Sequence, residues 1–130
     1  MNTSPASPRI LVVDDEQGVR RLLEYVLSNA DYKVDTANDG AAGLLALQAN
    51  NYDLLITDNN MPILSGLEMV KNLRSAQLNL PVIMVSGALN PDYLSDLDLE
   101  PVLFLPKPFS NTDLLAKVKS ALSGNLLPSP

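Results

Sequence analysis

Three short apolar runs constrain the fold of this chain most, because each ends in acidic or hydroxyl side chains. They extend from Arg9 to Asp15, from Asp53 to Asp58 and from Pro81 to Ser86. Apolar runs of this length are typical of strands that are buried on both faces of a parallel sheet. Tyr32 to Ala37 alternates like a strand, and Val102 to Leu105 predicts a fifth and very short one. The chain is therefore expected to form a sheet of five strands.

Segments with helical spacing lie between these strands. From Glu16 to Ala30, apolar side chains recur at intervals of three and four residues, which predicts an amphipathic helix. Its apolar positions are Val19, Leu22, Leu23, Val26 and Leu27. Ala41 to Ala49 predicts a second helix, which ends at Asn50 and Asn51. A third helix follows Asp58, with an apolar face formed by Leu67, Val70 and Leu73.

The last helix is predicted to run from about Thr112 to Leu122. Ser110 precedes it as the N-cap, and Asp113 follows three residues later, as in a capping box. The side chains expected to face the sheet are Leu114, Leu115, Val118 and Leu122. Because parallel strands need crossover connections, strands that alternate with helices predict an α/β fold, with helices on both faces of a parallel sheet.

The 130 residues fit a single domain. We expect this domain to occupy residues 9 to 122, between a flexible tail at 1 to 8 and a second tail, or the start of a linker, at 123 to 130. No apolar run approaches the roughly 18 to 20 residues that span a bilayer. Met1 to Pro8 also lacks the apolar core of a secretory leader. The expectation is a cytoplasmic protein that has no membrane partner.

Charge and composition exclude several kinds of chemistry. The 15 acidic and 9 basic residues give a net charge of −6, whereas nucleic-acid binding depends on Lys and Arg that neutralise phosphate, so we expect no direct nucleic-acid contact. The chain has no cysteine and no histidine, which excludes disulfides, thiolate metal sites and histidine bases. Any chemistry must use carboxylates, hydroxyls, amines and the backbone.

Polar side chains collect at the ends of the predicted strands. Asp14 and Asp15 end the first strand, Asp58 ends the third, Ser86 ends the fourth, and Lys107 follows the fifth. Open parallel sheets bind ligands beyond the carboxyl ends of their strands, so these side chains should converge. Crowded carboxylates repel one another and need a cation, and an all-oxygen site suits Mg²⁺. Mg²⁺ is the expected cofactor.

Four stretches carry these residues, and their order is Val12 to Glu16, Leu54 to Pro62, Pro81 to Gly87 and Phe104 to Phe109. Together, at the expected strand ends, they resemble the receiver domain of bacterial two-component response regulators. Any one stretch alone would be weak evidence, but four in order are specific. The resemblance covers about Arg9 to Leu122. It implies a flavodoxin-like fold of five βα units in three layers, with the strand order 2-1-3-4-5.

The resemblance also implies a role for each residue at this edge of the sheet. A sensor histidine kinase or a histidine phosphotransfer protein would donate a phosphoryl group to Asp58, which acts as the nucleophile. Asp15, Asp58 and the backbone carbonyl of Asn60 would contact Mg²⁺ directly, while Asp14 would act largely through water. Mg²⁺ and Lys107 would offset the charge of the phosphoryl group.

Other residues are implied to respond to phosphorylation. Ser86 would donate its hydroxyl to a phosphoryl oxygen and act as the switch, and Phe104 would change rotamer with it. The bond between Lys107 and Pro108 matches a cis peptide of the family. The implied outcome is a changed affinity for a downstream effector protein or output domain, with a homodimer on phosphorylation as a further form.

Each of these residues has a plainer structural interpretation. Asp14 to Glu16 suit the cap of the first helix, and Ser86 suits a local bond at a strand end. Alone, Lys107 would be a solvated surface lysine, Phe104 a core residue and Asn60 a turn residue. Only their combination favours a phosphoacceptor site.

Two other functions compete with a signalling phosphoacceptor. A Mg²⁺-dependent phosphatase of a Rossmann-like family also uses a strand-end aspartate, but it needs a second acid two residues later, where this chain has Asn60. A constitutive interaction module would not need Asp58 and Lys107. We expect a phosphorelay receiver that is not an enzyme acting on other molecules and that catalyses only its own phosphorylation and slow autodephosphorylation.

The segment from Asn90 to Pro101 departs most from the resemblance. Pro91 can begin a helix and Pro101 must end it, so the fourth helix should be short. Repulsion among four acids further weakens it, and these acids are Asp92, Asp96, Asp98 and Glu100. We expect local mobility here before phosphorylation, and ordering or displacement afterwards.

Overall fold

The computed structural model describes residues 7–87 and 99–123. Within these ranges the chain forms five strands and four helices. The elements are β1 (Arg9–Val13), α1 (Gln17–Asn29), β2 (Lys33–Ala37), α2 (Gly40–Ala49), β3 (Leu54–Asp58), α3 (Gly66–Ser75), β4 (Val82–Ser86), β5 (Val102–Pro106) and α5 (Asn111–Leu122). From β1 to β4 strands and helices alternate as the apolar runs predict, whereas residues 88–98, between β4 and β5, lie outside the described part of the chain.

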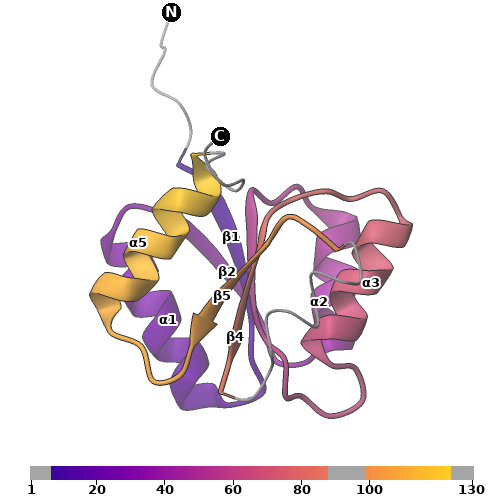
Figure 1. Cartoon of the computed structure of the whole chain (residues 1–130), viewed down its shortest axis with the longest axis horizontal. Coiled ribbons are helices and arrows are strands. Elements are labelled where there is room, and N and C mark those ends of the chain that lie inside the picture. The colour runs from indigo at the N-terminus through magenta and orange to yellow at the C-terminus, as the bar shows by residue number, and fades with distance from the viewer. Residues whose placement is uncertain (1–6, 88–98, 124–130) are drawn as a thin grey trace, which may run out of the picture.

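The five strands form one parallel sheet in the order β2-β1-β3-β4-β5. Figure 1 shows three layers, with α1 and α5 on one side of the sheet and α2 and α3 on the other. The α/β class and the expected strand order are therefore confirmed. Among the described helices, none combines the length and the apolar character that crossing a membrane requires.

The central strands are buried on both faces because alternate side chains enter two separate cores. In β1, Ile10 and Val12 belong to the core beneath α1 and α5, whereas Leu11 and Val13 belong to the core beneath α2 and α3. These four side chains are fully buried. Burial of each contributes about 2 kcal/mol, so the sheet rests on contacts with both helical layers.

One part of the predicted face of α1 is wrong. Leu23, Val26 and Leu27 are buried as expected, but Leu22 is 52% exposed. At about 100° per residue, Leu22 lies at the edge of the stripe that the buried residues form and turns towards solvent. Tyr25 is also exposed on this helix.

The first turn of α5 follows the sequence prediction. The Ser110 hydroxyl accepts a hydrogen bond from the Asp113 N–H at 3.0 Å, and the Asp113 carboxylate accepts one from the Ser110 N–H at 3.3 Å. Leu114 and Val118 are buried against the sheet, with Leu115 and Leu122 packed at the margin of the same core. A second capping box, which was not predicted from the sequence, joins Ser65 and Glu68 at the start of α3.

The predicted short helix within Asn90 to Pro101 lies mostly outside the described residues, as do the greater parts of both predicted tails. The described end of this segment begins at Leu99, which is buried. The Glu100–Pro101 peptide bond is cis. The Pro101 carbonyl accepts a hydrogen bond from the Val82 N–H at 3.2 Å, which aligns this segment with the start of β4.

Arg74, in the last turn of α3, joins two chain segments at the amino end of β4 and β5. Its Nε donates to the Leu99 carbonyl at 2.8 Å, and its Nη2 donates to the Pro101 carbonyl at 2.9 Å. Its Nη1 donates to the carbonyls of Leu78 and Leu80, at 2.8 and 2.9 Å. The side chain is half-buried, and burial lowers its pKa. One guanidinium thus satisfies four backbone acceptors.

We predict that Arg74→Met lowers the free energy of unfolding by about 2 to 3 kcal/mol, because partly buried carbonyls lose their donors. Arg74→Lys should recover only part of this loss, since an ammonium cannot reproduce the planar fork of donors. Urea denaturation measures both, and Lys71→Met, at an exposed position of the same helix, is the control. A stability of Arg74→Met equal to that of the control would contradict this role.

Candidate functional site

Asp58 ends β3 at the carboxyl edge of the sheet and is 4% exposed. Its Oδ2 accepts a hydrogen bond from the Lys107 ammonium at 3.1 Å, which is also an ion pair. Its Oδ1 accepts one from the Asn60 N–H at 3.1 Å. Both oxygens are therefore oriented by donors that follow the ends of β3 and β5.

Asp14 lies beside Asp58 because of the sheet register. Val13 pairs with Thr57, so the next residue of each strand continues at the same edge. Asp14 is 1% exposed, and its Oδ1 accepts a hydrogen bond from the Glu16 N–H at 2.9 Å. Its backbone carbonyl accepts one from the Arg20 guanidinium at 2.8 Å. These bonds fix the turn between β1 and α1.

Three carboxylates form a cluster at this edge. Ligand oxygens of Asp14, Glu16 and Asp58 all lie within 4.8 Å of one another. Glu16 was not among the predicted site residues, and Asp15, which was, is exposed at the surface beside the cluster. The Glu16 side chain makes no capping bond to α1, although its residue holds the N-cap position. Glu16 therefore caps α1 by its position and not by a side-chain hydrogen bond, and its carboxylate lies in the cluster.

The sequence offered only a weak indication of Glu16, namely its place directly after two strand-end acids. Whether a side chain in such a turn points towards the sheet edge depends on the backbone path between strand and helix. Here Asp14 accepts the Glu16 N–H, and this bond bends the chain so that the third acid faces the first. The bend is made by a local bond between residues two positions apart, and the pattern of polar and apolar residues does not show its direction.

The surroundings of Asp14 disfavour the ionised form of its carboxyl group. Burial raises the pKa of the Asp14 carboxyl, and the nearby charges of Asp58 and Asp15 raise it further. The hydrogen bond from the Glu16 N–H and the charge of Lys107 lower it, but burial dominates. A cation at this position would favour the ionised carboxylates.

Ser86 and Lys107 lie next to each other across the end of the sheet. The Lys107 N–H donates to the Ser86 carbonyl at 3.3 Å, and Ser86 is 7% exposed. The Lys107–Pro108 peptide bond is cis. The structure therefore brings Asp14, Asp58, Ser86 and Lys107 to one edge, where the sequence places them.

The remaining predicted residues lie around this edge. Met84 pairs with Phe104 and Ser86 with Pro106, so Ser86 and Phe104 share one face of the sheet, two positions apart. Phe104 packs against the core beneath α2 and α3. Asn60 is exposed and contacts the site through its backbone N–H on Asp58.

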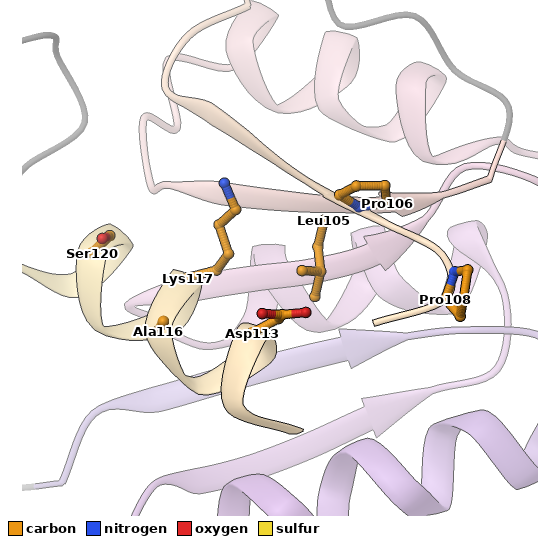
Figure 2. Close-up of a pocket in the computed structure, with 7 residues that line it drawn as sticks. All are labelled: Leu105, Pro106, Pro108, Asp113, Ala116, Lys117 and Ser120. Atoms are coloured by element: carbon orange, nitrogen blue, oxygen red, sulfur yellow. The ribbon is translucent and has the colours of Figure 1, made fainter. Parts of the chain in front are cut away.

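A groove of about 430 Å³ runs between β5 and α5 and does not include the carboxylate cluster. Figure 2 shows its lining, which consists of Leu105, Pro106, Pro108, Asp113, Ala116, Lys117 and Ser120. Only Pro108 among these belongs to the predicted site residues. The groove and the carboxylate cluster are therefore separate features of the surface.

Comparison with known families is consistent with this geometry. The family model of the response regulator receiver domain matches residues 10–119. The chain therefore belongs to the family of response regulator receiver domains, which are the receivers of two-component regulatory systems. Phosphorylation and Mg²⁺ are general features of that family.

Individual relatives support the assignment. The transcriptional regulatory protein PrrA of Mycobacterium bovis is 37% identical over 123 residues, which are 94% of this chain and 53% of PrrA. The chain thus spans about half the length of the curated relatives that it matches.

Solved structures show the same fold. Chemotaxis protein CheY4 of Vibrio cholerae has a TM-score of 0.82 at 31% identity, covering 90% of this chain and all of CheY4 (100%). Response regulator TrrA of Thermotoga maritima, solved in complex with Mg²⁺ and BeF, has a TM-score of 0.76 at 36% identity, covering 92% of this chain and 99% of TrrA.

We predict that Asp14→Asn raises the melting temperature by a few degrees at neutral pH in metal-free buffer, because it removes a buried charge. Since the pKa of Asp14 is raised in the folded state, its ionisation costs stability as the pH rises through that pKa. The gain should shrink as the pH falls towards the ordinary range of aspartate. Asp53→Asn, at an exposed acid, is the control for thermal melts from acid to neutral pH. No gain at neutral pH would contradict the burial cost.

Proposed function

We propose that this domain accepts a phosphoryl group on Asp58 from a phosphohistidine of a sensor kinase or phosphotransfer protein. The observation that carries the proposal is the placement of the Asp58 carboxylate. It lies at the carboxyl edge of the sheet, with Lys107 at 3.1 Å on one oxygen and a cluster of further carboxylates beside it. Family membership supports the same chemistry.

In the proposed reaction, a carboxylate oxygen of Asp58 forms a bond to phosphorus while the bond from phosphorus to the donor's histidine nitrogen breaks. The electron pair of that bond stays with the imidazole, and the product is an acyl phosphate. Phosphoryl transfer needs mainly positioning and charge stabilisation. The Asn60 N–H orients the Asp58 carboxylate. The Lys107 ammonium, which donates to Asp58 before the reaction, would donate to a phosphoryl oxygen after it.

The donor set of the cluster fits Mg²⁺, because it consists of carboxylate oxygens within 4.8 Å of one another. We propose that Asp14, Asp15, Asp58 and the Asn60 carbonyl hold the ion, and that Glu16 adds negative charge beside them. When bound, Mg²⁺ supplies positive charge that offsets the phosphoryl charge next to these acids.

The proposed response begins at Ser86, whose hydroxyl would donate to a phosphoryl oxygen. Phe104 lies on the same face of the sheet and is the proposed second switch residue. A downstream effector or output domain would read the change, and dimerisation on phosphorylation is part of the proposal. The domain's chemistry would be confined to its own Asp58, without turnover of other substrates.

We predict that incubation with acetyl phosphate and Mg²⁺ attaches one phosphoryl group to Asp58, mapped by mass spectrometry after borohydride trapping. Asp58→Asn should abolish the adduct, because an amide is not a nucleophile of this kind. Asp53→Asn, at the chain segment that leads into β3, is the matched control and should be labelled like the wild type. Undiminished labelling of Asp58→Asn would refute the assignment.

Asp15 is exposed and Glu16 belongs to the carboxylate cluster. Their contributions to Mg²⁺ binding can be distinguished by titrating the unphosphorylated protein with Mg²⁺ and following the titration by NMR. We predict that Asp15→Asn weakens Mg²⁺ binding by about tenfold or more, as the loss of a direct ligand should. Glu16→Gln should weaken it by a smaller factor, since its carboxylate acts through charge. Wild-type affinity in Asp15→Asn would show that Glu16 takes the place of Asp15 in the ligand set.

A further inference from the structure

Asn59 follows Asp58 directly and connects the loop after β3 to the start of α3. Its side-chain Oδ1 accepts a hydrogen bond from the Leu67 N–H at 2.9 Å. Its backbone carbonyl accepts bonds from the Gly66 N–H at 3.2 Å and from the Met61 N–H at 3.0 Å. Asn59 therefore uses both of its oxygens to bind the chain that follows it.

Asn59 and Ser65 together accept hydrogen bonds from the first N–H groups of α3. The first N–H groups of a helix have no partner within the helix. In α3, the N–H groups of Gly66 and Leu67 are bound by Asn59, and the Glu68 N–H is bound by the Ser65 hydroxyl at 3.1 Å. Ser65 thus caps the helix locally, whereas Asn59 attaches the helix to the end of β3.

The attachment is close. A Cβ added at Gly66 would lie 2.5 Å from the Asp58 carbonyl oxygen and 3.0 Å from the Asn59 Cα. Because Gly66 has no side chain, the start of α3 packs directly on the backbone at the end of β3. A shift of Asn59 would therefore move Asp58 and Asn60 relative to a rigid helix.

We infer that Asn59 is a positioning residue, whose side chain fixes Asp58 and the Asn60 carbonyl in the arrangement that binds the divalent cation. This inference rests on the proposed function, in which both groups are ligands. The hydrogen bond from Leu67 to Asn59 keeps the short loop in one conformation before the cation binds, since hydrogen bonds behind the ligands of a metal site orient those ligands.

Titration with Mg²⁺ alone, followed by NMR of the unphosphorylated chain, tests the inference. Asn59→Leu keeps the approximate size of the side chain and removes its acceptor. We expect it to raise the Mg²⁺ dissociation constant about tenfold and to speed hydrogen exchange of the Leu67 amide. Asn59→Asp retains the acceptor, so it should keep the Leu67 amide protected and bind Mg²⁺ at least as tightly as the wild type.

Ser65→Ala is the matched control, because it removes one cap acceptor from the same helix end without touching the residue beside Asp58. It should expose the Glu68 amide to exchange and leave the Mg²⁺ affinity within about twofold, as the loss of a local cap predicts. Asn59→Ala provides the same test should leucine prevent folding.

Two results would overturn the inference while leaving the proposed function intact. One is a wild-type Mg²⁺ affinity in both Asn59→Leu and Asn59→Ala. The other is an equal loss of affinity in Ser65→Ala, which would assign the effect to the helix end as a whole. If the wild type itself did not bind Mg²⁺, the proposed function would fail first.

Discussion

Repulsion among carboxylates at one edge of the sheet is the constraint on which the site depends. Asp14 and Asp58 are almost completely buried there. Glu16 completes the cluster, in which one carboxylate oxygen of each of the three residues lies within 4.8 Å of the others. Lys107 offsets part of this charge through Asp58, but burial still raises the pKa of Asp14. The fold therefore holds an arrangement that is unfavourable without a cation and suited to receive one together with a phosphoryl group.

The rest of the molecule supplies the rigidity that such an arrangement needs. Two cores, one on each side of the sheet, fix the strands whose ends carry the acids. At the carboxyl edge, Asn59 binds the loop after β3 to α3. At the opposite end of the same helix, Arg74 binds the segments that lead into β4 and β5. Helix α3 is thus attached at both ends to strands that form the site.

The parts of this design that follow from periodicity could be predicted from the sequence. The predicted ends of β2, β3 and β4 and the capping box of Ser110 and Asp113 agree with the structure, whereas β1 ends at Val13, two residues before its predicted end. The strand order also agrees, but it was implied by the family resemblance and not by periodicity. The exposed Leu22 was missed because apolar spacing does not define where a buried stripe ends. Glu16 and Asn59 were missed because their roles depend on the path of a turn and on backbone partners, which side-chain patterns do not reveal.

A crystal structure of the chain with Mg²⁺ and beryllofluoride, a mimic of the phosphoryl group, would show whether the carboxylate cluster receives a cation and a phosphoryl group together. We expect the beryllium on a carboxylate oxygen of Asp58, the Mg²⁺ among the acids of the cluster, and Lys107 and Ser86 turned towards the fluorides. Beryllofluoride bound at another residue, or an Asp58 that keeps its bond to Lys107 while the Mg²⁺ lies elsewhere, would contradict it.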